Sequence, residues 1–541
     1  MLSVLIFLPL AGGILAMLMP NADEDGGQRA GFVSLLTAAG TLGLAIGILA
    51  DFDTGGGLQQ VTDVTWISEL GIHYKLGVDG LNIFLILLTA LLWLAATVAA
   101  LLRSWERPRL FYMMLALGET AALGAFCAQD LALFVLFFDL MLIPFYFLIG
   151  IWGTGEDRVR ATTTFVIYTL VGSLLMLSAA VATGILATPP GGDTTFELSE
   201  LARRRLSQGS QDWIFLFFAA AFLVKMPAFP LHGWMPAAYR NAPTPVVAVL
   251  SGVLSKVGAY GFLRVVLPLY PNATIHFQEV ILVIGVAGII YGSIMAFTVT
   301  NVRLIAGYSS LAQLGFITIG IFSLRPDGAD GSVLQMFNHG LVVGAIFLIV
   351  ALLWERSGSE DLTRIGGLAM RAPVLAALFL IITLANLAMP GTANFMGEFY
   401  ILIGVFQSKI VFAFVASIGV VFAAYYAIRL FQRTMQNRRT ENSDSREIGL
   451  RDALVLGPLV ACIIALALYP GFILGRSDTS VKTTIAQTCL TGAYYNLSSG
   501  NAATTKVGVR CPSNPFDKSG PPPQLFTSSI SGSTAPATTT P

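Results

Sequence analysis

Long apolar stretches recur along almost the whole chain, and they constrain the fold more than any other feature. A helix needs roughly 20 apolar residues to cross a bilayer, and about 14 stretches reach that length. Only 11% of the residues are charged, whereas soluble domains carry about 25%. Basic and acidic residues are equal in number, 31 each, so no basic field is available to hold nucleic acid. The sequence therefore predicts an all-α polytopic membrane protein.

The apolar stretches predict where the helices cross the membrane. Two of them are interrupted by Met-Pro, at Met226-Pro227 and at Met389-Pro390, and an ionisable group follows each break within nine residues. Paired Pro-interrupted helices in corresponding positions indicate a transport site at mid-membrane. The predicted spans lie near residues 2–20, 31–50, 80–102, 110–128, 130–152, 163–186, 212–230, 242–268, 277–298, 302–323, 331–354, 373–408, 411–434 and 451–475.

Arginine residues predict how the chain is oriented in the membrane. When the loops are assigned alternately to two sides, one side receives most of the arginines, and we expect that side to be cytoplasmic and both termini to lie outside. A run at 203–205 falls on the other side, in a longer loop where the rule is weaker. The arginines of the expected cytoplasmic side are Arg103, Arg107, Arg109, Arg158, Arg160, Arg240, Arg303, Arg356, Arg364, Arg371, Arg433, Arg438, Arg439, Arg446 and Arg451.

Several ionisable residues stand inside the predicted spans, where a charge costs about 2.5–3.5 kcal/mol even on the lenient insertion scale. Structural alternatives exist for each: a snorkelling or ion-paired lysine, a protonated core carboxyl, a hydrogen-bonded histidine, or a carboxylate at a helix end. Glu119 is as readily structural as functional and is left outside the candidate site. The candidates are Asp139, Lys225, His232, Lys256, His339 and Glu398.

These residue types suit proton transfer. Burial makes a lysine easier to deprotonate, and a nearby carboxylate has the opposite effect, so a carboxylate such as Asp139 can control proton release from Lys225. Histidines titrate near neutral pH and pass protons through either ring nitrogen. Gly252, Gly258 and Gly261 would let other helices approach Lys256 closely. The residues alone predict an ion-translocating membrane subunit.

Six sequence strings resemble the antiporter-like membrane subunits of respiratory complex I, the NADH–quinone oxidoreductase. The string that contains Glu398 is similar to the M-type chains, whose L-type and N-type relatives typically carry lysine at that position. The resemblance covers roughly residues 1–475. The strings are FFDLMLIP at 137–144, KMPAFPLHGWMP at 225–236, APTPV at 242–246, YSSLAQLGF at 308–316, FNHG at 337–340 and MPGTANFMGEF at 389–399.

The resemblance implies a fold of 14 helices with two inverted five-helix repeats and two broken helices. The implied units are N-terminal helices over 1–109, repeats over 110–268 and 277–434, and a last helix over 451–476. The Ser-, Thr- and Pro-rich residues 477–541 are expected to form a low-complexity extracytoplasmic tail.

The resemblance also implies roles for the candidate residues. Lys225 would take up the proton, with Asp139 as its partner, and Lys256 would relay it. His232 and His339 would bridge, and Glu398 would be the exit group. This chain would be a non-redox subunit of a proton translocase in a bacterial inner membrane. NADH, FMN, iron–sulfur clusters and quinone would belong to partner subunits, which include the L-like and N-like chains.

Two positions depart from the family. Asp139 stands where glutamate is usual, so its reach is one methylene shorter, and Gln313 stands where histidine is frequent and cannot carry charge. Two other functions fit the same residues: a subunit of a multisubunit cation/proton antiporter or membrane-bound hydrogenase, and a non-pumping scaffold. Neighbouring genes would distinguish the antiporter from complex I: redox-subunit genes indicate complex I, and genes for small antiporter subunits indicate the antiporter. The scaffold would be distinguished by variants of Lys225 and Glu398 that alter assembly but leave the proton yield per electron unchanged.

Overall fold

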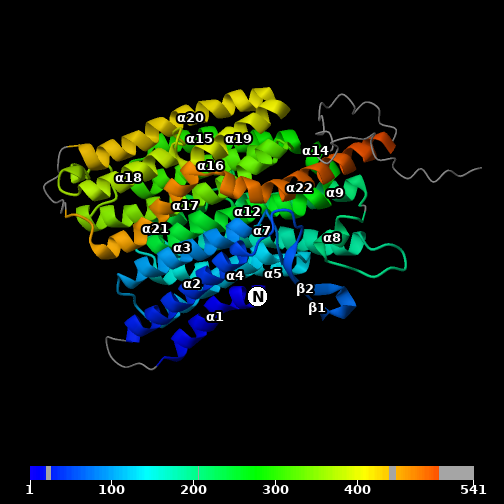
Figure 1. The fold of residues 1–541 in the computed structure, drawn as a ribbon, viewed down its shortest axis with the longest axis horizontal. Helices are drawn as coiled ribbons and strands as arrows, with labels where there is room; N and C mark the ends of the chain where they lie inside the picture. Colours follow the sequence, from blue (N-terminus) through cyan, green and yellow to red (C-terminus); the bar gives the residue numbers. More distant parts are fainter. Residues whose placement is uncertain (20–25, 205, 438–445, 499–541) are drawn as a thin grey trace, which may run out of the picture.

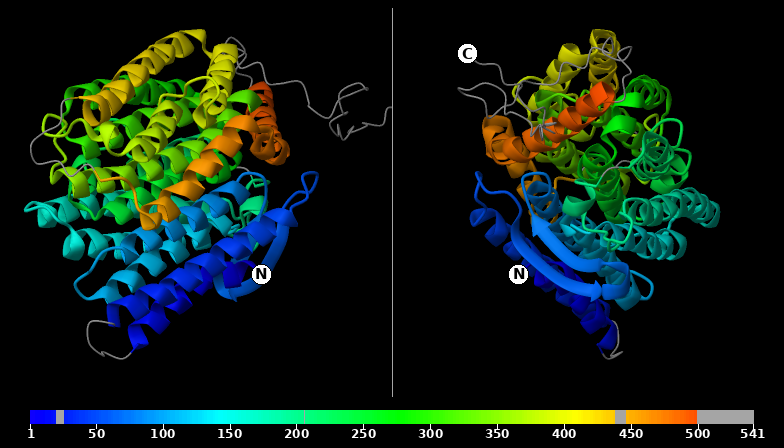
Figure 2. Two further views of the ribbon diagram at one scale, coloured as in Figure 1. Left: turned by 60° about the vertical axis from the view of Figure 1, so that its left-hand side comes forward. Right: turned by 90° about the vertical axis from the view of Figure 1, so that its right-hand side faces the viewer.

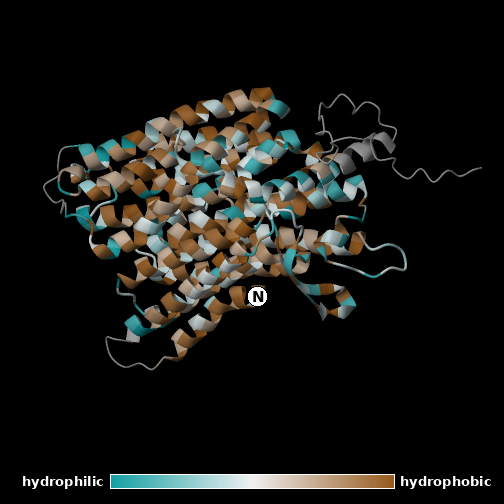
Figure 3. Cartoon of the chain, in the orientation of Figure 1, coloured by the Kyte–Doolittle hydropathy of each residue, from teal (hydrophilic) through white to brown (hydrophobic). Residues whose placement is uncertain are grey.

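The computed structural model describes residues 1–19, 26–204, 206–437 and 446–498. Its helices run side by side along an elongated bundle (Figure 1), and the hydrophobic colour covers much of their length (Figure 3). Among the described residues, 11 helices are long and apolar enough to cross a membrane. The predicted all-α polytopic fold is confirmed, and every predicted span contains a helix.

Most spans are single helices. The two helices of the N-terminal pair, α1 (Leu2–Leu18) and α2 (Gly26–Ala50), lie at one edge of the bundle, and α20 (Ile410–Phe431) lies at the opposite edge (Figures 1 and 2). The other continuous helices are α3 (Ile83–Leu101), α4 (Pro108–Cys127), α7 (Arg158–Leu186), α15 (Gln278–Thr298), α16 (Val302–Ile321), α17 (Pro326–Ser357) and α21 (Leu450–Leu468).

Four spans are interrupted, and prolines account for most of the breaks. Pro144 lies just past a break at Met141, and Pro227 and Pro390 each follow the end of a helix, because proline removes a backbone donor and collides with the preceding turn. The pieces are α5 (Leu131–Leu140) and α6 (Leu142–Trp152); α9 (Gln208–Lys225) and α10 (Met235–Asn241); α11 (Thr244–Val249), η2 (Leu250–Leu254), α12 (Ser255–Gly261), η3 (Phe262–Val266) and α13 (Leu267–Leu269); and α18 (Pro373–Asn386) and α19 (Ala393–Ser408).

A β-hairpin covers one end of the bundle, hereafter the hairpin end; the opposite end, which holds the loops at 102–107 and 153–157, is the arginine-rich end (Figures 1 and 2). Strands β1 (Gln59–Ile67) and β2 (Ile72–Val78) pair antiparallel. The hairpin docks where Gln129 N–H donates to the Lys75 carbonyl (2.9 Å) and His73 N–H donates to Asp130 Oδ2 (3.1 Å). Hydropathy gave no indication of this element, because most side chains of β1 are exposed and β2, although partly buried, is only seven residues long.

Helix α22 (Gly471–Ser498) crosses the hairpin end, so the residues up to Ser498 do not form the low-complexity tail expected from 477 onward. Its threonines and serines bond to the bundle: Thr488 Oγ1 donates to the Leu267 carbonyl (3.0 Å), and the Gly80 N–H donates to Ser480 Oγ (3.0 Å). The amino-acid composition of this segment could not predict these hydrogen bonds, because they join it to distant parts of the chain. The rest of the predicted tail, 499–541, lies outside the described residues.

An ion-pair cluster at the hairpin end links the hairpin to the segment that contains Glu197. Lys75 pairs with both Glu197 and Asp63. Burial acts to raise the pKa of both carboxyls. At Glu197 this is outweighed by the hydrogen bond from Lys75. At Asp63 it is outweighed by the hydrogen bonds and charges of His73 and Lys75. The pKa of Asp63 therefore lies below its ordinary 3.8 and that of Glu197 below its ordinary 4.5. The cluster stabilises the docked hairpin fully when the pH is above the ordinary values. This stabilisation is lost as the pH falls through the lowered pKa values of the folded protein.

We expect Glu197→Gln at pH 7 to weaken hairpin docking. A partly exposed ion pair is worth about 0.5–1 kcal/mol, so exchange of the β2 amide hydrogens should accelerate roughly two- to fivefold. Hydrogen exchange read by mass spectrometry measures this directly. Glu200→Gln is the matched control, because Glu200 pairs only with Arg204 one turn along its own segment. Equal acceleration in both variants would contradict the assignment.

Candidate functional site

Lys225 is the last residue of α9, immediately before the break that begins at Met226. Its side chain is 5% exposed. The ammonium donates a hydrogen bond to the Phe138 carbonyl (3.1 Å) and lies 4.4 Å from the centre of the Phe138 ring. A buried amine held by one carbonyl and one aromatic face keeps few other partners, so it is poised to exchange its proton.

Asp139 follows Phe138 on α5, beside the break at Met141. It interacts electrostatically with Lys225 and lies beside Ser173 of α7, so the structure brings together the carboxylate and lysine that the sequence could not place. The two described side chains nevertheless form no direct ion pair, and Asp139 Oδ1 has no hydrogen-bond partner. The Lys225 ammonium is thus hydrogen-bonded to the backbone carbonyl of Phe138, the residue before Asp139, and not to the Asp139 carboxylate.

Glu119 is buried in α4, and its Oε1 has no hydrogen-bond partner among the described residues. None of its interactions involves Lys225 or Lys256. Asp139, by contrast, interacts with Lys225.

Lys256 is fully buried at the centre of the third interrupted span. The preceding segment η2 is a π-helix, whose wider turn frees backbone carbonyls. Lys256 Nζ donates to one of these, the Ser251 carbonyl (2.8 Å), and to Ser255 Oγ (3.2 Å). Like Lys225, it is held by neutral oxygens rather than by a carboxylate.

Two glycines bring neighbouring helices close to Lys256, as the sequence suggested. A side chain at Gly258 would collide with the Phe222 carbonyl of α9, and one at Gly252 would collide with Leu92 and crowd the backbone of Gly340 on α17. The close approach at Gly340 sets the neighbouring His339 within electrostatic reach of Lys256. The helix that carries Lys256 is thus packed between the two that carry Lys225 and His339.

The two histidines differ in their surroundings. His339 is fully buried on α17, and neither of its ring nitrogens has a partner among the described residues. His232 lies in the break after α9, where its ring packs against Phe229 and Tyr291, with centroids 5.8 and 4.9 Å away. His339 therefore lies within electrostatic reach of Lys256, whereas His232 is set among aromatic rings.

Glu398 lies on α19 and is 3% exposed. Gln313 of α16 donates a hydrogen bond from Nε2 to Glu398 Oε1 (2.5 Å), and Gln335 of α17 donates from Nε2 to Gln313 Oε1 (2.7 Å). Gly397 provides the room, because a side chain there would collide with Gln335. Gln313, at the position where histidine is frequent, therefore holds the carboxylate directly by its amide.

Several buried polar atoms between His339 and Glu398 have no partner in the described chain. They include Gln335 Oε1, Asn338 Oδ1 and both side-chain polar atoms of Asn394. A buried polar group without a hydrogen bond costs about 1–3 kcal/mol, so such groups are normally satisfied by water. The interface of α17 and α19 thus has the polar lining that a short water chain requires.

The structure places five candidates in three buried groups: Asp139 with Lys225, Lys256 with His339, and Glu398 with Gln313 and Gln335. The close approach of α9 to Gly258 joins the first two groups, and Gln335 lies one turn before His339 on α17. We call the five candidates the proton row.

Sequence reasoning missed the lining residues Gln335, Asn338 and Asn394. Helical spacing offered a signal for two of them, since Gln335 precedes His339 by four residues and Asn394 precedes Glu398 by four. Over the described parts of the chain, no three His, Cys, Asp or Glu side chains gather as metal ligands.

The chain resembles known proteins over nearly its full length. Residues 128–423 match the family described as NADH:quinone oxidoreductase/Mrp antiporter, TM. NADH-quinone oxidoreductase subunit M of Rhodobacter capsulatus is 36% identical over 492 residues, which cover 89% of this chain and 95% of that protein. Subunit M of Escherichia coli (strain K12) is 35% identical over 499 residues, with 89% and 97% covered.

Solved structures share the fold. A chain of respiratory complex I from Thermus thermophilus with bound NADH superposes with a TM-score of 0.82 at 30% identity, covering 90% of this chain and all of that one. A chain of the Mrp complex from Dietzia sp. DQ12-45-1b gives a TM-score of 0.79 at 20% identity, covering 91% and 99%. The second likeness concerns the fold alone.

Proposed function

The chain belongs to the NADH:quinone oxidoreductase/Mrp antiporter family of membrane subunits, and from this we propose that it translocates protons as an M-type membrane-arm subunit of an NADH–quinone oxidoreductase. The observation that carries the proposal is the buried row of proton-exchanging groups from Asp139 to Glu398. Both of its lysines are held by neutral oxygens. Ionisable side chains inside a membrane are energetically costly and mark functional sites such as proton relays.

The proposed transfer begins at Lys225. Quinone reduction in other subunits shifts charge along the membrane arm and changes how closely Asp139 approaches the ammonium. When the carboxylate approaches, Lys225 stays protonated; when it withdraws, the ammonium releases its proton towards Lys256. Lys256 passes a proton to His339, and Glu398 receives one through water held at the α17–α19 interface. Glu398 then releases its proton to the outside, and Lys225 takes the next proton from the cytoplasmic side, so that every group returns to its starting protonation state.

We further propose the setting of this activity. The chain acts as the non-redox, translocating subunit of the oxidoreductase, in a bacterial inner membrane with both termini outside. L-like and N-like chains are its neighbours in the membrane arm. NADH, FMN, iron–sulfur clusters and quinone are bound by partner subunits. His232 is proposed to bridge the two lysines when the break after α9 rearranges.

Asp139→Asn tests the first step. We expect NADH-driven proton pumping and electron transfer both to fall in a fully assembled complex, because the amide cannot hold and release the ammonium as a carboxylate does. Pumping in inverted membrane vesicles, followed with a pH-sensitive dye, provides the readout. Glu119→Gln is the matched control, since it also neutralises a carboxyl, but one whose interactions do not involve the lysines. Unchanged pumping in Asp139→Asn would make that residue structural.

A cation/proton antiporter subunit is the second candidate, favoured by the matching family, whose description includes the Mrp antiporter. The two functions differ in what drives the protons. In vesicles that hold the native complex, pumping driven by NADH supports the oxidoreductase. Proton movement driven by an added sodium gradient, with no response to NADH, would support the antiporter.

A further inference from the structure

A basic crevice opens at the arginine-rich end, between α2, α3, α4 and α21. It consists of two cavities of about 640 and 790 Å³ that share Gln28, Leu101, Leu102 and Arg451. We define the arginine crevice as these two cavities. It lies at the end of the bundle away from the hairpin and does not include any residue of the proton row.

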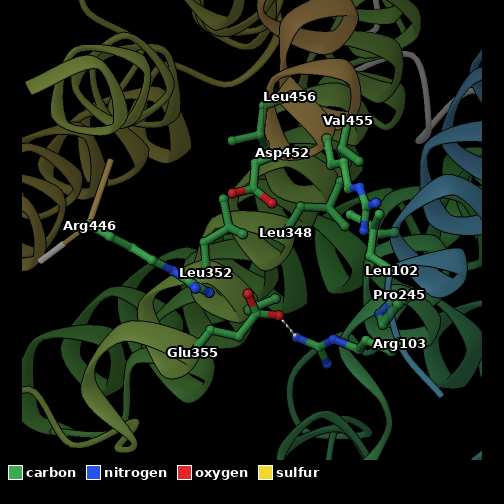
Figure 4. A pocket seen from close by; sticks show the side chains of 13 residues that line it. Leu102, Arg103, Pro245, Leu348, Leu352, Glu355, Arg446, Asp452, Val455 and Leu456 are labelled. Carbon is green, nitrogen blue, oxygen red and sulfur yellow. Dashed lines mark hydrogen bonds and ion pairs between the residues drawn. The ribbon is translucent and has the colours of Figure 1, made fainter. Parts of the chain in front are cut away.

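The polar lining of the arginine crevice is positively charged. Its arginines are Arg29, Arg103, Arg107, Arg109 and Arg451, and the described residues that line the two cavities include no Asp or Glu. Arg103 is held in place by Glu355 (2.9 Å), which lies in a smaller adjoining pocket of about 190 Å³ (Figure 4). Within the described chain, Arg29, Arg107 and Arg451 form no ion pair.

The remaining walls are apolar and face outward. Met17, Phe32, Leu101 and Leu102 line the crevice, and the exposed fractions of Phe32 and Leu102 are 56% and 40%. Leu36, one turn along α2 towards the middle of the span, is 57% exposed. An exposed apolar strip on a spanning helix is expected to contact acyl chains, and it begins directly beneath the arginines.

We propose that the arginine crevice binds an anionic phospholipid, with its phosphate on Arg107 and Arg451 and its acyl chains along Phe32 and Leu36. Guanidinium groups bind phosphate oxygens through paired hydrogen bonds, and basic pockets between spanning helices at the cytoplasmic side suit anionic headgroups. The adjoining apolar strip selects a lipid over a free phosphate ion. This site is separate from the proton row and holds whether or not the row conducts.

The test uses the purified, assembled complex, washed with detergent and then exposed to mixed micelles of phosphatidylglycerol or phosphatidylcholine. Native mass spectrometry counts the retained lipid. We expect retention of phosphatidylglycerol to fall at least about fivefold for each arginine removed in Arg107→Gln and Arg451→Gln. Arg160→Gln and Arg240→Gln are the matched controls, since both are exposed arginines of the same end outside the crevice, and they should retain the lipid.

Three results would overturn the proposal. Equal retention in the crevice variants and the controls would show that the crevice does not hold the lipid. Full displacement by inorganic phosphate would identify a simple anion site. Loss of a neighbouring subunit from the crevice variants, without any retained lipid in the unaltered complex, would identify the crevice as a protein interface.

Discussion

Lys225→Met is expected to abolish most of the proton pumping while leaving the complex assembled. Removing a general acid–base group typically costs about 10²–10⁴ in rate, and methionine cannot carry a proton. Assembly should survive, because methionine has a similar length and removes a buried charge instead of creating one. The partners left behind are the Phe138 carbonyl, which is a neutral acceptor, and Asp139, which can become neutral by taking up a proton.

Pumping in inverted vesicles and the amount of assembled complex in native gels are the paired measurements for this variant. Lys409→Met is the control, because Lys409 is a lysine of the hairpin end that pairs with the exposed Glu279 (2.6 Å). Normal pumping in assembled Lys225→Met would remove this residue from the mechanism. Loss of assembly alone, with a normal proton yield in the remaining complex, would support the scaffold alternative.

Lys256→Met is expected to have an effect of similar size. Lys256 is fully buried midway along the row, and His339 is the titratable group within its electrostatic reach. Without it, the proton released by Lys225 has no acceptor before His339. The variant should therefore lose pumping although Asp139 and Lys225 are intact, and a Lys225→Met and Lys256→Met double variant should be no worse than either single one.

Non-additivity is the informative outcome of that double variant. Groups that act in one sequence lose the whole function when either is removed, so the second substitution adds nothing. If the two losses multiplied instead, the lysines would serve separate paths. Ser255→Ala is a suitable control, since it removes one hydrogen bond to Lys256 (3.2 Å) and leaves the amine in place.

The sequence predicted the membrane-spanning fold because spans depend on local hydropathy. It predicted two of the four interrupted spans, at Pro227 and Pro390, because proline acts within a few residues. It did not predict the β-hairpin, whose strands are too short to register as membrane spans, or the helix α22, which depends on hydrogen bonds to distant parts of the chain. The bond from Lys225 to Phe138 joins residues 87 positions apart. No local pattern indicates that a lysine is held by a carbonyl next to its expected carboxylate.

The exit end shows the same limit. Glu398 stood out as a charge in an apolar helix, and the substitution at Gln313 was visible from the motif. The structure adds that Gln313 and Gln335 form a chain of two amide hydrogen bonds onto Glu398. Three helices have to meet for this chain to form, and helix packing of that kind cannot be read from spacing along one segment.

The measurement that tests the account most directly is the number of protons translocated per electron in vesicles that carry Glu398→Gln. We expect an assembled complex with a clearly lowered ratio, because the glutamine cannot receive the proton from the water chain at the α17–α19 interface. Glu279→Gln, an exposed glutamate at the hairpin end, should keep the normal ratio. An unchanged ratio in assembled Glu398→Gln would contradict the proposal that protons leave through this row.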